Sequence, residues 1–150
     1  MKFVTILRRE QKESSLHYIG RKMIVNYLHR LYPDHGLELW TEFPPAQGAQ
    51  HSDISVISYI PQPRVKIWVE VQTTPLGQTW REKLEKIISD MKNFLDELWI
   101  LLVGKCNTNK EKEILGKIIN EIFRERKITN IKVFFLTNEL EIKGVENFGS

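Results

Sequence analysis

The segment that most constrains the fold is residues 98–103, Leu-Trp-Ile-Leu-Leu-Val, in which every side chain is apolar. Side chains of a strand alternate between its two faces, so a strand without any polar residue must be covered on both faces. The segment is far shorter than the roughly 20 apolar residues that a membrane-spanning helix needs. It therefore predicts a central, buried strand in a sheet flanked by helices.

The other elements follow from apolar periodicity and from capping and turn residues. The first elements are a helix at 14–32, started by Ser14 or Ser15, and three strands at 37–43, 52–59 and 65–73. A second helix is capped by Thr79 and has an apolar stripe from Trp80 to Leu95. A third helix is capped by Thr108 and has an apolar stripe from Ile114 to Phe123, and a strand follows at 131–136. The predicted order is α-β-β-β-α-β-α-β, a mixed α/β fold. No linker divides the sequence, so we expect one domain over residues 1–150.

Composition restricts the function without fixing it. The net charge of +3 and a pI near 9.0 permit an acidic partner such as nucleic acid but do not require one. Cys106 is the single cysteine, which excludes an intramolecular disulfide and a Cys-rich zinc site. The N-terminal apolar stretch is too short for a signal peptide. We therefore expect a soluble, cytoplasmic protein.

The strand at 65–73 combines an apolar face with a polar one. Its alternate valine and isoleucine residues lie on one face, whereas Trp68, Glu70 and Gln72 lie on the other. In one interpretation the polar face is solvated, as on an open antiparallel sheet. Trp68, beside Glu70 on this face, could stack on a base or be covered by a loop or a partner chain.

In the alternative interpretation, the polar face carries a metal site. If the preceding hairpin turns about the Pro61–Gln62 bond, Ile54 lies opposite Val69 and Asp53 lies opposite Glu70. A slip of one residue would send every side chain to the wrong face, so the core itself selects this register. Two opposed carboxylates are destabilising unless a cation lies between them, and Mg²⁺ prefers such oxygen ligands.

A third carboxylate is available from the strand at 37–43. Glu42 belongs to its polar face, with Glu38 and Trp40. If the loop at 44–50 closes a second hairpin, Glu42 arrives near Asp53.

These residues resemble the motif of the PD-(D/E)XK nuclease superfamily, in which an aspartate begins the second strand and E-x-K ends the third. Here the corresponding residues are Asp53 and Glu70-Val71-Gln72. Residues 43–54, Phe-Pro-Pro-Ala-Gln-Gly-Ala-Gln-His-Ser-Asp-Ile, are also similar to archaeal-type Holliday-junction resolvases, which carry a Pro-Ala-Ser-Gly-like loop before that aspartate. The resemblance covers residues 13–104. It implies a restriction-endonuclease-like α-β-β-β-α-β core, here with an additional C-terminal helix and strand.

The resemblance implies that Asp53 and Glu70 bind Mg²⁺ or Mn²⁺, with the backbone carbonyl of Val71 as a further ligand. Gln72 occupies the position of the lysine, and this departs from the common pattern. A lysine stabilises hydroxide or phosphate by charge, whereas a glutamine can only orient a water by hydrogen bonding. Lys83 or Lys86 on the following helix could return an ammonium group to the site.

Superfamily members often carry a further glutamate on the first helix, and Glu13 is its nearest counterpart here. An acidic residue at a helix start also complements the helix dipole, so a structural role for Glu13 stays open. For DNA contacts, Gly48 could admit close backbone approach, His51 could contact a phosphate, and the basic N-terminal region could bind the backbone. The expected DNA-binding residues are Arg8, Arg9, Gln47, Gly48, His51 and Lys83.

The sequence thus supports two functional hypotheses. In the first, the protein is a Mg²⁺-dependent DNA endonuclease in which Asp53, Glu70 and Gln72 act with Glu42 or Glu13. It would be junction-selective or restriction-like, and a homodimer. In the second, it is a catalytically inactive nuclease-fold module that binds nucleic acid or a protein partner.

Overall fold

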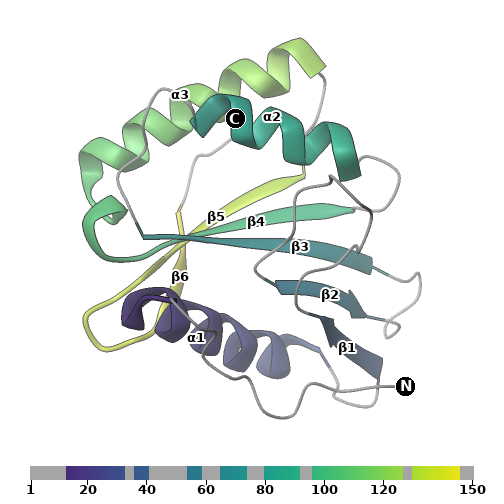
Figure 1. The fold of residues 1–150 in the computed structure, drawn as a ribbon, viewed down its shortest axis with the longest axis vertical. Coiled ribbons are helices and arrows are strands. Elements are labelled where there is room, and N and C mark those ends of the chain that lie inside the picture. Colours follow the sequence, from purple (N-terminus) through teal and green to yellow (C-terminus); the bar gives the residue numbers. More distant parts are fainter. Residues whose placement is uncertain are drawn as a thin grey trace.

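The computed structural model of the chain describes residues 13–32, 36–40, 54–58, 65–73, 80–91, 96–126 and 130–145. Their elements are α1 (Ser15–Leu31), β1 (Leu37–Trp40), β2 (Ile54–Ser58), β3 (Val65–Gln72), α2 (Trp80–Met91), β4 (Glu97–Leu102), a 3-10 turn (Gly104–Cys106), α3 (Asn109–Arg126), β5 (Ile131–Leu136) and β6 (Ile142–Gly144). The sheet lies between α1 on one face and α2 and α3 on the other (Figure 1).

The sheet is mixed and open, with the strand order β1-β2-β3-β4-β5-β6. Strands β1, β2 and β3 form an antiparallel meander, whereas β3, β4 and β5 run parallel and are joined through α2 and α3. Strand β6 folds back antiparallel on β5. The predicted α/β class, mixed sheet and element order are confirmed. Strand β6 was not predicted.

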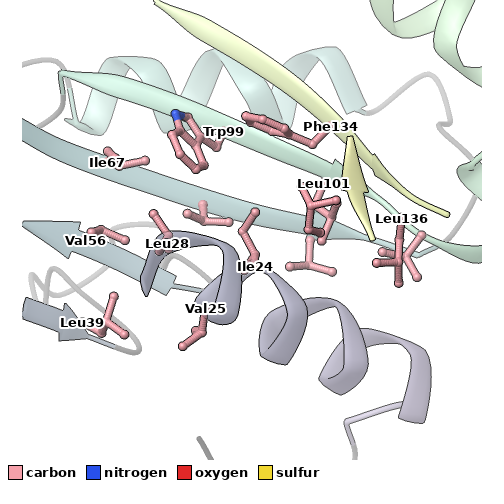
Figure 2. Close-up of a cluster of buried hydrophobic side chains, with 14 of the residues drawn as sticks. Ile24, Val25, Leu28, Leu39, Val56, Ile67, Trp99, Leu101, Phe134 and Leu136 are labelled. Atoms are coloured by element: carbon pink, nitrogen blue, oxygen red, sulfur yellow. The ribbon is translucent and has the colours of Figure 1, made fainter. Parts of the chain in front are cut away.

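Strand β4 is buried on both faces, as its apolar sequence predicts. Trp99, Leu101 and Val103 belong to the core cluster beneath α1, whereas Leu98, Ile100 and Leu102 belong to the cluster beneath α2 and α3. Figure 2 shows the first cluster, in which Ile24 and Leu28 of α1 point toward the sheet residues. The central strand therefore joins the two layers of core.

Helix α1 lies close to the sheet at Gly20. A Cβ atom on this residue would lie 2.6 Å from Val71 Cγ1 and 3.1 Å from Val103 Cγ2. Only glycine leaves room for this contact, so it sets the spacing between helix and sheet. The first turns of α1 consequently lie over the carboxyl ends of β3 and β4.

Two helix starts carry the predicted caps. Ser14 Oγ accepts a hydrogen bond from the His17 amide at 3.1 Å, and Thr108 Oγ1 accepts one from the Glu111 amide at 3.2 Å. The predicted cap of α2, Thr79, lies outside the described residues. Over the described ranges, no helix combines the length and apolar character needed to cross a bilayer.

Arg81 of α2 forms ion pairs with two glutamates of α3. Arg81 Nη2 lies 2.8 Å from Glu125 Oε2, and Arg81 also pairs with Glu121. Both glutamates belong to the last turns of α3, so the link crosses between the helices. Beneath it, Leu84, Ile87 and Ile88 attach α2 to the sheet. These contacts fix the position of α2 above β3.

Candidate active site

The hairpin register predicted from the core pattern is confirmed. Ile54 pairs with Val69 and Val56 pairs with Ile67 in the antiparallel ladder of β2 and β3. The predicted second hairpin is also present in the described residues, since β1 pairs antiparallel with β2. These ladders align the carboxyl-terminal part of β3 with the start of β2 and the end of β1.

Glu70 is a buried carboxylate near the carboxyl end of β3. The residue is only 6% exposed, and its Oε1 accepts a hydrogen bond of 2.8 Å from the indole Nε1–H of Trp68. The two residues stand two positions apart on one face of the strand, as the alternation of a strand requires. An unpaired buried carboxylate would be strongly destabilising, and this bond helps to stabilise Glu70 in its buried position.

The interpretation of this face as a solvated, open sheet surface was wrong. Trp68 is 1% exposed and belongs to the core cluster with Leu84, Ile87 and Ile88 of α2. Strand β3 is paired on both sides, with β2 and β4, and α2 covers it. Base stacking by Trp68 is therefore also wrong, because the chain itself already buries the ring, with residues of α2 packed against it.

Lys83 brings a positive charge to the same carboxylate. Its Nζ lies 3.6 Å from Glu70 Oε2, and its side chain is 45% exposed. The ammonium thus bridges the buried carboxylate and solvent. Lys83 and Lys86 were both predicted as lysines that could bring an ammonium group to the site, and the structure places Lys83 beside Glu70. Lys86 lies exposed on the same helix.

Gln72 ends β3 on the same face as Glu70, and its backbone is held from the β4 side. Its carbonyl accepts a hydrogen bond of 2.9 Å from the Val103 amide and another from the Cys106 thiol. Successive carbonyls of a strand point in opposite directions, so the Val71 carbonyl faces the β2 side. The metal-ligand role of Val71 stays a prediction.

Glu13 forms a second carboxylate cluster, with residues of α1. Its two oxygens accept hydrogen bonds of 2.7 Å from Nε and Nη2 of Arg21, and His17 Nδ1 contacts it as well. Both side chains of the Glu13–Arg21 pair are almost fully buried. The helix that supplies Arg21 packs on the sheet face opposite α2, so these contacts give Glu13 a structural role. Its catalytic role stays a prediction.

The remaining predicted site residues lie outside the described residues. They are Arg8, Arg9, Glu42, Gln47, Gly48, His51 and Asp53. Within the described ranges, no group of three or more histidine, cysteine, aspartate or glutamate side chains is arranged to hold a metal ion. The described residues thus supply Glu70 and the Val71 carbonyl as hard oxygen donors, the type that Mg²⁺ prefers. The predicted ligand set also includes Asp53.

Two contacts of the site were missed from the sequence. Trp68 was considered for stacking and not as a hydrogen-bond donor to Glu70, although the spacing of the two residues already puts them on one face. Arg21 is not among the site residues that the sequence pattern indicated, and it is the buried partner of Glu13. A charged residue on the apolar stripe of a helix was the available signal.

Comparison of the sequence with protein-family models and with curated proteins gives no match. The resemblance to the PD-(D/E)XK superfamily therefore remains a prediction from the motif and the order of elements.

Proposed function

We propose that this protein is a Mg²⁺- or Mn²⁺-dependent endodeoxyribonuclease built on a restriction-endonuclease-like core. The observation that carries the proposal is the buried Glu70 carboxylate, which has the Trp68 indole on one oxygen and the Lys83 ammonium near the other. Burying a carboxylate on a strand is unfavourable in itself, so a position that keeps one with dedicated partners is a candidate for function.

The proposal pairs Glu70 with Asp53. The ladder of β2 and β3 includes the pair Ile54 and Val69, and the next step in the same register would pair Asp53 with Glu70. By strand alternation Asp53 would share the face of Glu70. A divalent cation between the two carboxylates, with the Val71 carbonyl as a further ligand, would relieve their repulsion.

Glu42 is the third carboxylate in this proposal. The ladder of β1 and β2 includes the pair Trp40 and Ser55, and two further steps in the same register would pair Glu42 with Asp53. Leu37 and Leu39 of β1 belong to the core beneath α1, so Glu42 would project to the opposite face, with Asp53. This register favours Glu42 over Glu13 as the residue that completes the site.

Each residue then has a separate chemical task. A bound Mg²⁺ or Mn²⁺ would neutralise charge on the scissile phosphate and make a coordinated water more acidic. Asp53 and Glu70 hold that ion, and Gln72 orients the attacking water by hydrogen bonding. The Lys83 ammonium stabilises the negative charge that grows on the phosphate, a task that the lysine of the E-x-K motif performs in the superfamily it resembles.

The substrate we propose is DNA recognised by its shape, such as a junction, and bound by a homodimer. The single domain contains one sheet and its covering helices, with no separate element for reading a target sequence in the described residues. The basic residues Arg8 and Arg9, with His51 and the Gln47-Gly48 loop, would contact phosphates.

A second candidate function is a catalytically inactive module that binds nucleic acid or a protein. It is favoured by the same ion pair, because Lys83 already neutralises Glu70 without any metal. The glutamine at position 72 also supports it.

A cleavage assay separates the two candidates. The protein is incubated with duplex, single-stranded, flap and four-way-junction DNA in Mg²⁺, in Mn²⁺ and in a chelator. The nuclease proposal expects metal-dependent cleavage of at least one substrate, abolished in Asp53→Asn and Glu70→Gln variants that keep the parent's circular dichroism spectrum. Binding of DNA in a mobility-shift assay without cleavage under any condition would favour the inactive module.

A further inference from the structure

We infer that Trp68 is a positioning residue, whose indole N–H orients the Glu70 carboxylate for metal binding. The inference rests on the proposed function, because it concerns the same metal site. It goes beyond that proposal in giving a task to a buried aromatic side chain that lies outside the motif.

The geometry leaves Glu70 little freedom. The indole ring is 1% exposed and belongs to the cluster with Leu84 and Ile87, so it cannot turn away from the strand. Its single N–H donates to Oε1 of Glu70 at 2.8 Å. This bond fixes the rotation of the carboxylate and leaves Oε2 as the oxygen 3.6 Å from the Lys83 ammonium.

Packing alone does not account for a tryptophan here. A phenylalanine or leucine would also fill an apolar core, whereas a buried indole requires an acceptor for its N–H. Tryptophan can donate one hydrogen bond and accept none, so it holds a carboxylate without competing for the cation. Groups that orient metal ligands in this way are worth about 10- to 100-fold in metal affinity.

The chain contains a matched control for this interaction. Trp99 on β4 is 2% exposed and donates its Nε1–H to Glu97 Oε1 at 3.1 Å. It belongs to the core cluster beneath α1, on the sheet face opposite Trp68. Glu97 pairs with Lys132 at 2.8 Å. Replacing either tryptophan by phenylalanine removes an indole N–H from a carboxylate two residues away, but only one of these carboxylates belongs to the proposed site.

The first test measures Mn²⁺ affinity by calorimetry for the parent, Trp68→Phe and Trp99→Phe, with thermal unfolding of each protein recorded without metal. Both variants are expected to lose some stability through the lost bond and smaller ring. Only Trp68→Phe should weaken Mn²⁺ binding, by about tenfold or more. The inference is overturned if a folded Trp68→Phe binds Mn²⁺ as tightly as the parent does. It is also overturned if Trp68→Phe and Trp99→Phe lose the same amount of Mn²⁺ affinity.

The second test uses the unmodified chain and so does not depend on a variant that folds. In a ¹⁵N–¹H spectrum each of the four tryptophans contributes one indole signal, and titration with Mg²⁺ should move the signal of Trp68 and leave that of Trp99 in place. A Trp68 signal that stays fixed while Mg²⁺ binds overturns the inference.

The two proposals fail in different ways. If Mg²⁺ moves the Trp68 signal but no DNA is cleaved, the nuclease proposal falls and the positioning role stands. If the parent cleaves DNA and Trp68→Phe binds Mn²⁺ as tightly, the positioning role falls alone. If the parent binds neither ion, both are overturned.

Discussion

The ammonium nitrogen of Lys83 lies 3.6 Å from Oε2 of Glu70, so α2 delivers a cation to a carboxylate buried on β3. In the motif that this sequence resembles, the lysine stands on the strand itself, at the position occupied here by Gln72. In the proposed function, Lys83 supplies from α2 the positive charge that the motif lysine would supply from β3.

Lys83→Met is expected to lower the cleavage rate by about two to three powers of ten, since a preorganised charge beside the reacting phosphate is removed. Stability should fall only in part, because Lys83 is 45% exposed and the buried Glu70 carboxylate keeps its hydrogen bond from Trp68. The measurement is single-turnover cleavage at saturating Mg²⁺. Lys117→Met, an equal charge loss at an exposed position of α3, serves as the control. Equal rates in the two variants would remove Lys83 from the catalytic mechanism.

The fold was largely predictable because its strands carry strong and independent signals. The apolar run that contains Leu98 and Val103 identified the central strand, and the alternation around Ile67 and Val69 selected one register for the hairpin. A wrong register would have exposed a whole apolar face, so the core determines the alignment.

Short elements and buried polar groups were less predictable, since both depend on tertiary context. Strand β6 has three residues, too few to show a periodic pattern, and it follows a turn in which Leu140 has a φ of 62°. The burial of Trp68 depends on where α2 packs, which its own strand does not encode. The Glu13–Arg21 pair likewise joins a residue that precedes α1 to one on the buried side of that helix, and no local pattern specifies which residue pairs with Arg21.

A pair of substitutions at Glu70 separates charge from hydrogen bonding. Glu70→Gln keeps an oxygen for the Trp68 indole but removes the negative charge, so metal-dependent cleavage should disappear with little change in stability. Glu70→Leu leaves the buried indole N–H without its acceptor, which should cost about 1–3 kcal/mol of unfolding free energy more than Glu70→Gln does. Urea titrations of both variants provide the comparison. Equal stability of the two would mean that the Trp68 bond contributes nothing.

Gly20→Ala is expected to destabilise the fold. The added Cβ would lie 2.6 Å from Val71 Cγ1, and overpacking of this kind costs about 1–3 kcal/mol. Alanine favours a helix by about 1 kcal/mol over glycine, which offsets part of this cost. Gly144→Ala is the control, since nothing lies within 4 Å of the position of its Cβ. Unfolding in urea should show a loss for the first variant only.

Stability should fall at alkaline pH partly through Cys106. Burial raises the pKa of this thiol, so the folded state retains the proton at pH values where the unfolded chain releases it. The stabilising contribution is complete below the ordinary thiol range of about 8.5 and is lost as the pH rises above it. Between pH 7 and 9.5, the parent should therefore lose more unfolding free energy than Cys106→Ala does. Parallel pH profiles for the two proteins would contradict this assignment.

The last prediction tests whether positions 72 and 83 supply the same charge. If the Lys83 ammonium performs the task of the motif lysine, adding Gln72→Lys to Lys83→Met should restore most of the lost cleavage rate. The new side chain would extend from the end of β3 on the face that carries Glu70, within reach of the same phosphate. Gln72→Lys alone should retain or raise activity, since the site then has both cations.

The control is Gln72→Met in the Lys83→Met background, which adds a long side chain without charge and should leave the rate low. A double variant with lysine at position 72 that stays as slow as Lys83→Met would show that Lys83 acts in another way, for example by holding α2 in place.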